Sequence, residues 1–155
     1  MTGPGGLLRK MANLDIFLID YEIYKANPNW WLEIIEIFLK PGLKFKLSLE
    51  KGQTNILEKF STYDSDSEIS IGKNLIFLEG ILNGEIIKDF KASYKVVNVG
   101  GIDYYCPFNS LEIVENYCSA HYGREIYLTR LVDEDFSKVI KVVRPLNEYL
   151  KIDVS

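Results

Sequence analysis

The stretch "LKFKLSLE", residues 43–50, alternates between apolar and polar residues without interruption. Successive side chains of an extended chain point to opposite sides, so the alternation gives this segment one apolar and one polar face. The apolar face consists of Leu43, Phe45, Leu47 and Leu49. This pattern predicts an antiparallel strand that packs one face against a core and leaves the other in solvent.

The segment before this strand, "KANPNWWLEIIEIFLKPG" at residues 25–42, has the features of a helix. Asn27 can cap it, Pro28 suits the first helical position, and Pro41-Gly42 would end it. Its apolar residues recur at helical spacing over a broad arc, and they are Trp30, Trp31, Ile34, Ile35, Ile37 and Phe38. A helix with so broad an apolar arc is expected to lie against a sheet.

The middle of the chain carries several strand signals. They are "EISI" at residues 68–71, "NLIFLEGIL" at 74–82 and "FKASYKVV" at 90–97. Asn83-Gly84, between apolar runs, is the strongest short hairpin signal in the chain. Residues 54–63 are expected to form a strand, with a short helix as the alternative. This part of the chain is therefore expected to be a meander of about five strands.

A second helix is expected at residues 108–123, "FNSLEIVENYCSAHYG". Asn109 and Glu112 have the spacing of a capping box, with Asn in place of the usual Ser or Thr. Gly123 stands where a left-handed C-terminal cap belongs. Residues 125–132 are then expected to form a strand.

The C-terminal part completes the predicted fold class. Residues 136–150 have apolar residues at helical spacing, and Pro145, which lacks a backbone N–H, should kink the helix or make it restart. A strand followed by a helix remains the alternative there. Together the elements predict an α+β fold, an antiparallel meander of about five or six strands packed against two or three helices. Residues 11–155 are expected to form a single domain, and residues 1–10 a disordered extension or cloning remnant.

Composition limits the classes of partner and the compartment. The 155 residues include 18 Lys and Arg against 22 Asp and Glu, a formal net charge of −4. The chain therefore lacks a basic field for a phosphate backbone, and we expect no direct nucleic-acid binding. The longest apolar runs fall far short of the ~20 residues that span a bilayer, and the N-terminus is unlike a secretory signal. Cys106 and Cys118 are too few for a disulfide framework, and free thiols in a reducing cytoplasm are favoured over the alternative of a single bridge between them.

The stretch "STYDSDSEIS", residues 61–70, places Asp64, Asp66 and Glu68 at every second position. Counted from Asp64, the positions that an EF-hand loop fills with Gly and Glu hold apolar residues, so we expect no calcium site. Two interpretations remain open. The stretch is either a negative knob that meets a basic partner, with Tyr63 as its aromatic anchor, or a soluble turn between strands.

Cys118 and the only histidine, His121, are three residues apart and would share one face of the expected helix. A Cys–His pair can act as nucleophile and base. Cys118 also falls on an apolar stripe with Leu111, Val114 and Tyr117, where a cysteine is usually a small core residue, and this interpretation is favoured. The chain has no phosphate-binding glycine motif and no G-x-S-x-G elbow. We therefore expect no catalytic residue, cofactor or metal.

The chain has two pairs of neighbouring aromatic residues, Trp30-Trp31 and Tyr104-Tyr105. Neighbouring side chains on a helix or a strand point in different directions, so the two rings of each pair cannot face the same way. One ring of each pair is expected in the core and the other half exposed, where an aromatic side chain is a favoured anchor for a partner. The candidate partner-binding residues are therefore Trp30, Tyr63, Asp64, Asp66, Glu68 and Tyr104.

These observations favour a small, acidic, intracellular protein that binds another protein with a basic surface. An immunity or antitoxin-type inhibitor of a basic toxin or nuclease needs a rigid scaffold, negative surface charge and aromatic anchors, and no catalytic machinery. The alternative is a small-molecule-binding domain or small enzyme with a pocket on the concave sheet face. A cavity of several hundred Å³ with converging polar groups would favour that alternative.

Overall fold

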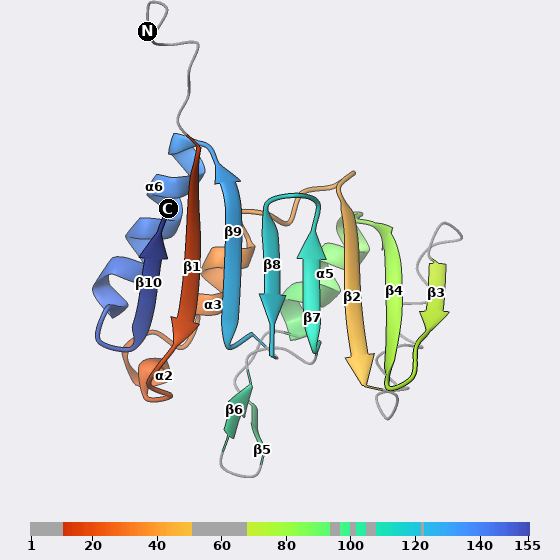
Figure 1. Cartoon of the computed structure of the whole chain (residues 1–155), viewed down its shortest axis with the longest axis horizontal. Helices are drawn as coiled ribbons and strands as arrows, with labels where there is room; N and C mark the ends of the chain where they lie inside the picture. Colours follow the sequence, from red (N-terminus) through yellow and green to blue (C-terminus); the bar gives the residue numbers. More distant parts are fainter. Residues whose placement is uncertain (1–10, 51–67, 94–96, 100–101, 105–107, 122) are drawn as a thin grey trace, which may run out of the picture.

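The computed structural model describes residues 11–50, 68–93, 97–99, 102–104, 108–121 and 123–155 (Figure 1). In this part of the chain, eight strands form one antiparallel sheet in the order β10-β1-β9-β8-β7-β2-β4-β3. The strands are β1 (Ala12–Leu18), β2 (Lys44–Glu50), β3 (Glu68–Ile71), β4 (Leu75–Ile81), β7 (Ser110–Ile113), β8 (Tyr117–Ala120), β9 (Glu125–Leu131) and β10 (Leu150–Val154). A separate hairpin pairs β5 (Val97–Val99) with β6 (Ile102–Tyr104).

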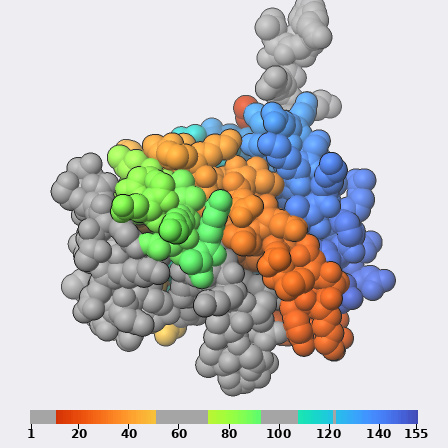
Figure 2. Space-filling view, turned by 180° about the vertical axis from the view of Figure 1, so that it is seen from behind, coloured from red at the N-terminus to blue at the C-terminus, as the bar shows by residue number. Residues whose placement is uncertain are grey.

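The helices lie together on one side of this sheet, as the views from the front and from behind show (Figures 1 and 2). They are α2 (Ile23–Ala26), α3 (Trp30–Ile35), α5 (Gly84–Ser93), α6 (Asp133–Val143) and the 3-10 helix η1 (Arg144–Leu146). We call the side under the helices the covered face and the opposite side, over which no described helix lies, the open face. The predicted α+β class with an antiparallel sheet is confirmed, and the sheet has more strands than expected.

The core lies between the covered face and the helices. In β2 the expected alternation is confirmed, because Phe45, Leu47 and Leu49 are buried while Lys44 and Glu50 are exposed. Ser48 departs from it, being buried on the polar side of the strand. The largest side chains that fill the core are Trp30, Trp31, Phe38, Phe45, Phe90, Phe108 and Tyr117. Large rings therefore occupy the covered face, where a pocket under the helices would need room.

Both tryptophans of the Trp30-Trp31 pair are buried, each with 1% of its surface exposed, so the expectation that one would be half exposed is wrong. The indole N–H of Trp31 donates to the Gly123 carbonyl at 2.8 Å, and its ring meets Tyr117 edge-on at 6.2 Å. The helix α3 also contacts α6. A short helix enclosed by a sheet and a second helix buries more than one side, which accounts for both rings.

The helix expected at residues 108–123 is wrong, because this segment forms the hairpin β7–β8. Its buried residues alternate as in strands, and they are Leu111, Ile113, Tyr117 and Ser119. Glu115 adopts a left-handed conformation (φ 68°) in the turn, and the next residue, Asn116, accepts a hydrogen bond from Thr129 of β9 at 2.9 Å. The apolar residues of this short segment fit both the helical and the strand period. The segment forms strands because it pairs with β2 on one side and β9 on the other.

The hairpin expected at Asn83-Gly84 is also wrong, because α5 begins there, and the strand expected at residues 90–97 is wrong over residues 90–93, which are the end of α5. The Asn83 carboxamide oxygen accepts a hydrogen bond from the Ile86 N–H at 2.9 Å, which caps the helix. Asn favours both hairpin turns and helix N-termini, so the dipeptide alone fits either structure. Ile86 and Phe90, four residues apart, are buried on the inner side of α5.

At the C-terminal end, the helix is confirmed over α6, and Pro145 lies within η1, where the α-helix gives way to a 3-10 turn. The alternative of a strand before Pro145 is wrong. No strand was expected at β1, and the helical pattern expected up to residue 150 ends at η1, after which β10 begins. The strands expected at residues 68–71, 74–82 and 125–132 are confirmed as β3, β4 and β9. Residues 1–10 and 54–63, for which expectations were given, lie outside the described residues.

Candidate functional site

The open face is built by strand register, which aligns residues that are far apart in the sequence. Consecutive register partners across seven strands, from β10 to β4, are Asp153, Asp15, Tyr127, Cys118, Glu112, Lys46 and Glu79. Their chain neighbours, such as Ile16, Ile126 and Leu47, are buried on the covered face, so this row lies on the open face. It contains four carboxylates and one lysine. We call it the acidic row.

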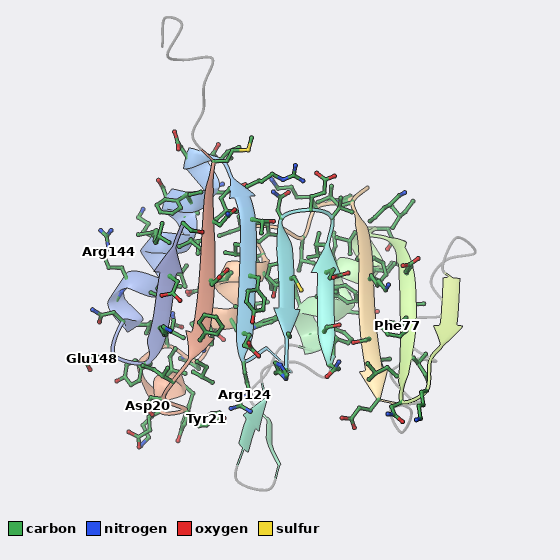
Figure 3. The ribbon with its side chains drawn as sticks, in the orientation of Figure 1. Asp20, Tyr21, Phe77, Arg124, Arg144 and Glu148 are labelled. Atoms are coloured by element: carbon green, nitrogen blue, oxygen red, sulfur yellow. The ribbon has the colours of Figure 1, made fainter. Side chains whose placement is uncertain are left out.

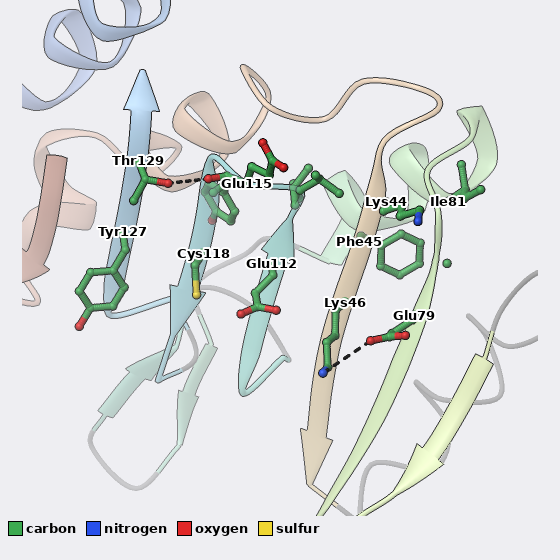
Figure 4. Close-up of a pocket in the computed structure, with 14 residues that line it drawn as sticks. Lys44, Phe45, Lys46, Glu79, Ile81, Glu112, Glu115, Cys118, Tyr127 and Thr129 are labelled. Atoms are coloured by element: carbon green, nitrogen blue, oxygen red, sulfur yellow. Dashed lines mark hydrogen bonds and ion pairs between the residues drawn. The ribbon is translucent and has the colours of Figure 1, made fainter. Parts of the chain in front are cut away.

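The acidic row is only partly neutralised. Lys46 lies 3.5 Å from Glu79, and both side chains are about half exposed (Figure 4). At the other end of the row, Lys151 of β10 lies 3.8 Å from Asp153. Among the described residues, Asp15 and Glu112 have no such ion pair within 4 Å. Because exposed ion pairs add little stability, these charges are available to a partner more than they serve the fold.

Aromatic rings stand beside the acidic row. Phe17 of β1 meets Tyr127 edge-on with ring centroids 5.8 Å apart, and the Lys151 ammonium lies 5.8 Å from the Phe17 ring. The Lys46 ammonium lies 5.1 Å from the ring of Phe77 on β4. Figure 3 shows Phe77 toward the β3 end of the sheet. These rings are half-buried, so each presents part of its surface to solvent. The open face therefore combines negative charge with aromatic side chains at both ends.

A hollow of about 810 Å³ lies on the open face between β4 and β9. Figure 4 shows the side chains that line it, including Lys46, Glu112, Cys118 and Tyr127 at one end and Ile81 at the other. Lys46 and Glu79, on the neighbouring strands β2 and β4, both line this hollow and form an ion pair. The hollow is thus large enough for a small molecule and sits on the face opposite the helices.

Cys118 does not have the environment of a nucleophile. It lies on the open face of β8, half-buried, whereas Tyr117 beside it points into the core. Burial, and to a smaller extent the negative charge of Glu112, raises the pKa of the Cys118 thiol. Because the thiolate is the reactive form, this environment makes the group less reactive. The expected apolar stripe is also wrong, since Val114 is exposed and Cys118 faces away from the core.

His121 does not share a helix face with Cys118, because it lies in the turn after β8 with a left-handed backbone (φ 51°). Its Nε2 atom is 2.9 Å from a carboxylate oxygen of Glu125. The other oxygen of Glu125 accepts a hydrogen bond from the Tyr127 hydroxyl at 2.5 Å. That hydrogen bond is the largest of the effects that raise the pKa of Tyr127 to about 12, so the phenol stays neutral at physiological pH.

The six candidate partner-binding residues are not brought together among the described residues. Trp30 is in the core, where it offers no surface ring. Glu68 begins β3 and is the register partner of Glu79, so its backbone stands next to the acidic row. Tyr104 ends β6 in the separate hairpin. The remaining three, Tyr63, Asp64 and Asp66, lie outside the described residues.

The acidic row could not be predicted from the sequence. The polar half of "LKFKLSLE" indicated a solvent face for β2, but Asp15, Glu112 and Tyr127 belong to other segments and carry no shared motif. They become neighbours only through a strand order in which β1 pairs with β9, and β2 with β7. Each strand carries a local pattern that indicates its solvent face. The pairing that brings these faces together is not encoded in any local pattern.

Comparisons with protein-family models, with curated proteins and with solved structures find no match to this chain. Within the described residues, no three His, Cys, Asp or Glu side chains gather as metal ligands would. None of the helices in the same residues is long and apolar enough to cross a membrane. The geometry of the open face is therefore the basis for a functional argument.

Proposed function

We propose that this protein binds another protein through its open face, and that the partner presents a basic surface. The observation that supports this most is the acidic row, four carboxylates and one lysine on the side of the sheet that no described helix covers. Negative charge concentrated on one face accelerates encounter with a positive surface and disfavours acidic competitors. Within this class, we propose an immunity or antitoxin-type inhibitor of a basic toxin or nuclease.

The aromatic side chains of the open face suit the same role. Phe17 and Tyr127 are held together edge-on, and Phe77 stands toward the other end of the sheet. Half-buried rings on rigid strands lose little conformational entropy on binding, which makes them effective anchors. An inhibitor acts by occupying a surface, so it needs no activated nucleophile. The raised pKa of the Cys118 thiol is compatible with such a role.

The acidic stretch of residues 61–70 extends this proposal. Glu68 starts β3 at the edge of the sheet, and its backbone partner is Glu79 of the acidic row. In the sequence, Asp64 and Asp66 come directly before β3. We therefore keep Tyr63, Asp64, Asp66 and Glu68 as further candidates for contact with the basic partner.

A small-molecule site is the second candidate, because the hollow of about 810 Å³ on the open face has the volume of a ligand site. Its polar groups are not arranged to bind a ligand, because Lys46 is paired with Glu79 and the Cys118 thiol has a raised pKa. A ligand there would contact the same side chains as a protein partner. The experiment below separates the two by the position of the changed charges and by the molecule that is bound.

The test compares two double variants that change the net charge equally. Asp15→Lys with Glu112→Lys reverses two charges of the acidic row, while Glu36→Lys with Glu134→Lys reverses two exposed charges on the helical side. Each pair changes the formal charge from −4 to −4 + 4 = 0. Both variants are mixed with the product of the neighbouring open reading frame of the source genome, and association rates and inhibition are measured at low and high salt.

We expect the open-face variant to associate at least about tenfold more slowly at low salt and to lose inhibition, and the helical-side variant to behave as the wild type. Equal weakening of both variants would mean that only total charge matters, and it would remove the open face from the proposal. Binding that both variants retain would do the same. A small molecule co-purified with the wild type and lost from the open-face variant would favour the second candidate.

A further inference from the structure

The strand β10 forms one edge of the sheet, and its hydrogen bonds to β1 show which of its groups face outward (Figure 1). Asn13 and Ser155 exchange two backbone hydrogen bonds, at 2.8 and 3.0 Å, and the Ile19 N–H donates to the Tyr149 carbonyl at 2.9 Å. Because antiparallel pairs alternate along a strand, every second residue from Tyr149 to Ser155 bonds to β1. The residues between them direct their N–H and C=O groups to the edge, and these are Leu150, Ile152 and Val154.

This edge is accessible over most of its length. Lys151, Asp153 and Val154 are exposed, the last with 59% of its surface in solvent, and Ile152 is half-buried. No described strand lies beyond β10, and α6 lies on the covered side of the sheet, with its C-terminal turns extending past β10 in the view of Figure 1. A row of unpaired backbone groups is a template for another strand, and proteins either protect such an edge or use it.

The side chains of β10 are complementary to themselves in one register only. A second β10 can pair antiparallel through the outward groups about a twofold axis at Lys151, Ile152 or Asp153. The axis at Lys151 would oppose two lysines, and the axis at Asp153 would oppose two aspartates. The axis at Ile152 places each Lys151 opposite the partner's Asp153. In that register the charged pairs are the non-hydrogen-bonded ones, whose side chains are closest.

We infer that β10 pairs with β10 of a second copy of this chain, about a twofold axis through Ile152. Leu150 then faces the partner's Val154, and two Lys–Asp pairs flank the axis on the open face. The interface is isologous, as in most homodimers. The same charges would protect a monomeric edge by repelling other strands, so the two roles predict opposite oligomeric states.

The outer side of α6 offers additional contact area. A hollow of about 570 Å³ lies along Phe136, Ile140 and Arg144, and Figure 3 shows Arg144 at the same end of the molecule as β10. A twofold axis perpendicular to the sheet keeps both helical layers on one side, so this part of α6 turns toward its copy. A five-residue strand alone buries less than a stable interface needs, and the helices supply further apolar surface.

The dimer would also place both open faces on the same side of one continuous sheet. A partner with two basic regions, or two partners, could then be bound at once, with the gain in apparent affinity that bivalency gives. The edge pairing itself does not depend on what the open face binds. Its test uses the protein alone, so failure of either proposal leaves the other standing.

The test is sedimentation equilibrium on the whole chain, from about 1 to about 500 μM, with charge variants of the edge. We expect the wild type to reach about twice the chain mass of 17.8 kDa. Lys151→Glu and Asp153→Lys each oppose like charges and should raise the dimer dissociation constant at least about tenfold. Mixing the two variants, or combining both changes in one chain, restores opposite pairs and should restore dimers. Lys91→Glu makes the same charge change on α5 and should have no effect.

Hydrogen exchange gives a second measurement that requires no variant. At dimer-forming concentrations the Ile152 and Val154 amides should exchange slowly, and on dilution they should become fast, while Lys151 and Asp153, bonded to β1, stay slow throughout. A wild type that is monomeric at every concentration would overturn the inference. So would single variants that dimerise as well as the wild type, or variants that remain monomeric when mixed.

Discussion

The covered and open faces of the sheet are made by alternate residues of the same strands, yet different forces hold them. In β2, Leu47 is fully buried beneath the helices, and its neighbour Lys46 contacts Glu79 and Phe77 on the open face. Close packing makes each covered side chain depend on many others, whereas the open side chains are joined by solvent-exposed ion pairs and ring contacts, which add little stability. The covered face therefore determines the stability of the fold. The charges of the open face contribute little to stability, so they can be adapted to a binding partner.

The largest effect should come from breaking the covered face at its centre. Trp31→Ala removes a ring that is 1% exposed, together with its hydrogen bond to Gly123 and its edge-on contact with Tyr117. We expect the free energy of unfolding to fall by about 3–5 kcal/mol, as for other large-to-Ala core changes. Urea unfolding followed by fluorescence or circular dichroism measures this.

Trp31→Phe is the matched control, because it keeps most of the ring and loses the indole N–H. It should destabilise the protein by less than the alanine variant, through the unpaired Gly123 carbonyl and the lost volume. Near-equal stability of the wild type and Trp31→Ala would contradict the packing described for α3.

A pair of adjacent residues compares the two faces directly. Leu47→Ala should lower the free energy of unfolding by about 2–5 kcal/mol, since Leu47 is fully buried and its removal leaves a cavity. Lys46→Ala, one residue earlier, should change it by no more than about 0.5 kcal/mol, because its ion pair with Glu79 is half exposed. Both are measured by urea unfolding under the same conditions. Similar losses at both positions would mean that the open face is part of the core, and the comparison would fail.

The same difference between faces explains what the sequence could predict. Burial imposes a pattern within one segment, so the covered face of β2 was evident from Phe45, Leu47 and Leu49 alone. Short segments that fit two patterns were misassigned, as Asn83-Gly84 was, because a cap and a hairpin turn use the same residues. The acidic row depends on the pairing of β2 with β7 and of β1 with β9, which no local pattern encodes.

The smallest effect concerns the chemistry of the open face. In a Cys106→Ser background, in which Cys118 is the only thiol, modification by a disulfide reagent at pH 8 should be slower than that of free cysteine. The reason is that burial, then Glu112, raises the pKa of Cys118, so less thiolate is present at a given pH. The rate should therefore keep rising above pH 9. Glu112→Gln removes the smaller of the two causes and should speed the reaction slightly, with no change in urea unfolding.

The same shift has a consequence for stability, with a definite sign. The folded protein holds the Cys118 proton more tightly than the unfolded chain does, so ionisation favours unfolding, and this contribution is present below pH 9 and lost as the pH rises above it. Tyr127, with its pKa raised to about 12, acts in the same direction at higher pH. A Cys118 that reacts as fast as free cysteine would show that the open face there is more solvated than its burial indicates, and would return the thiol to consideration as a functional group.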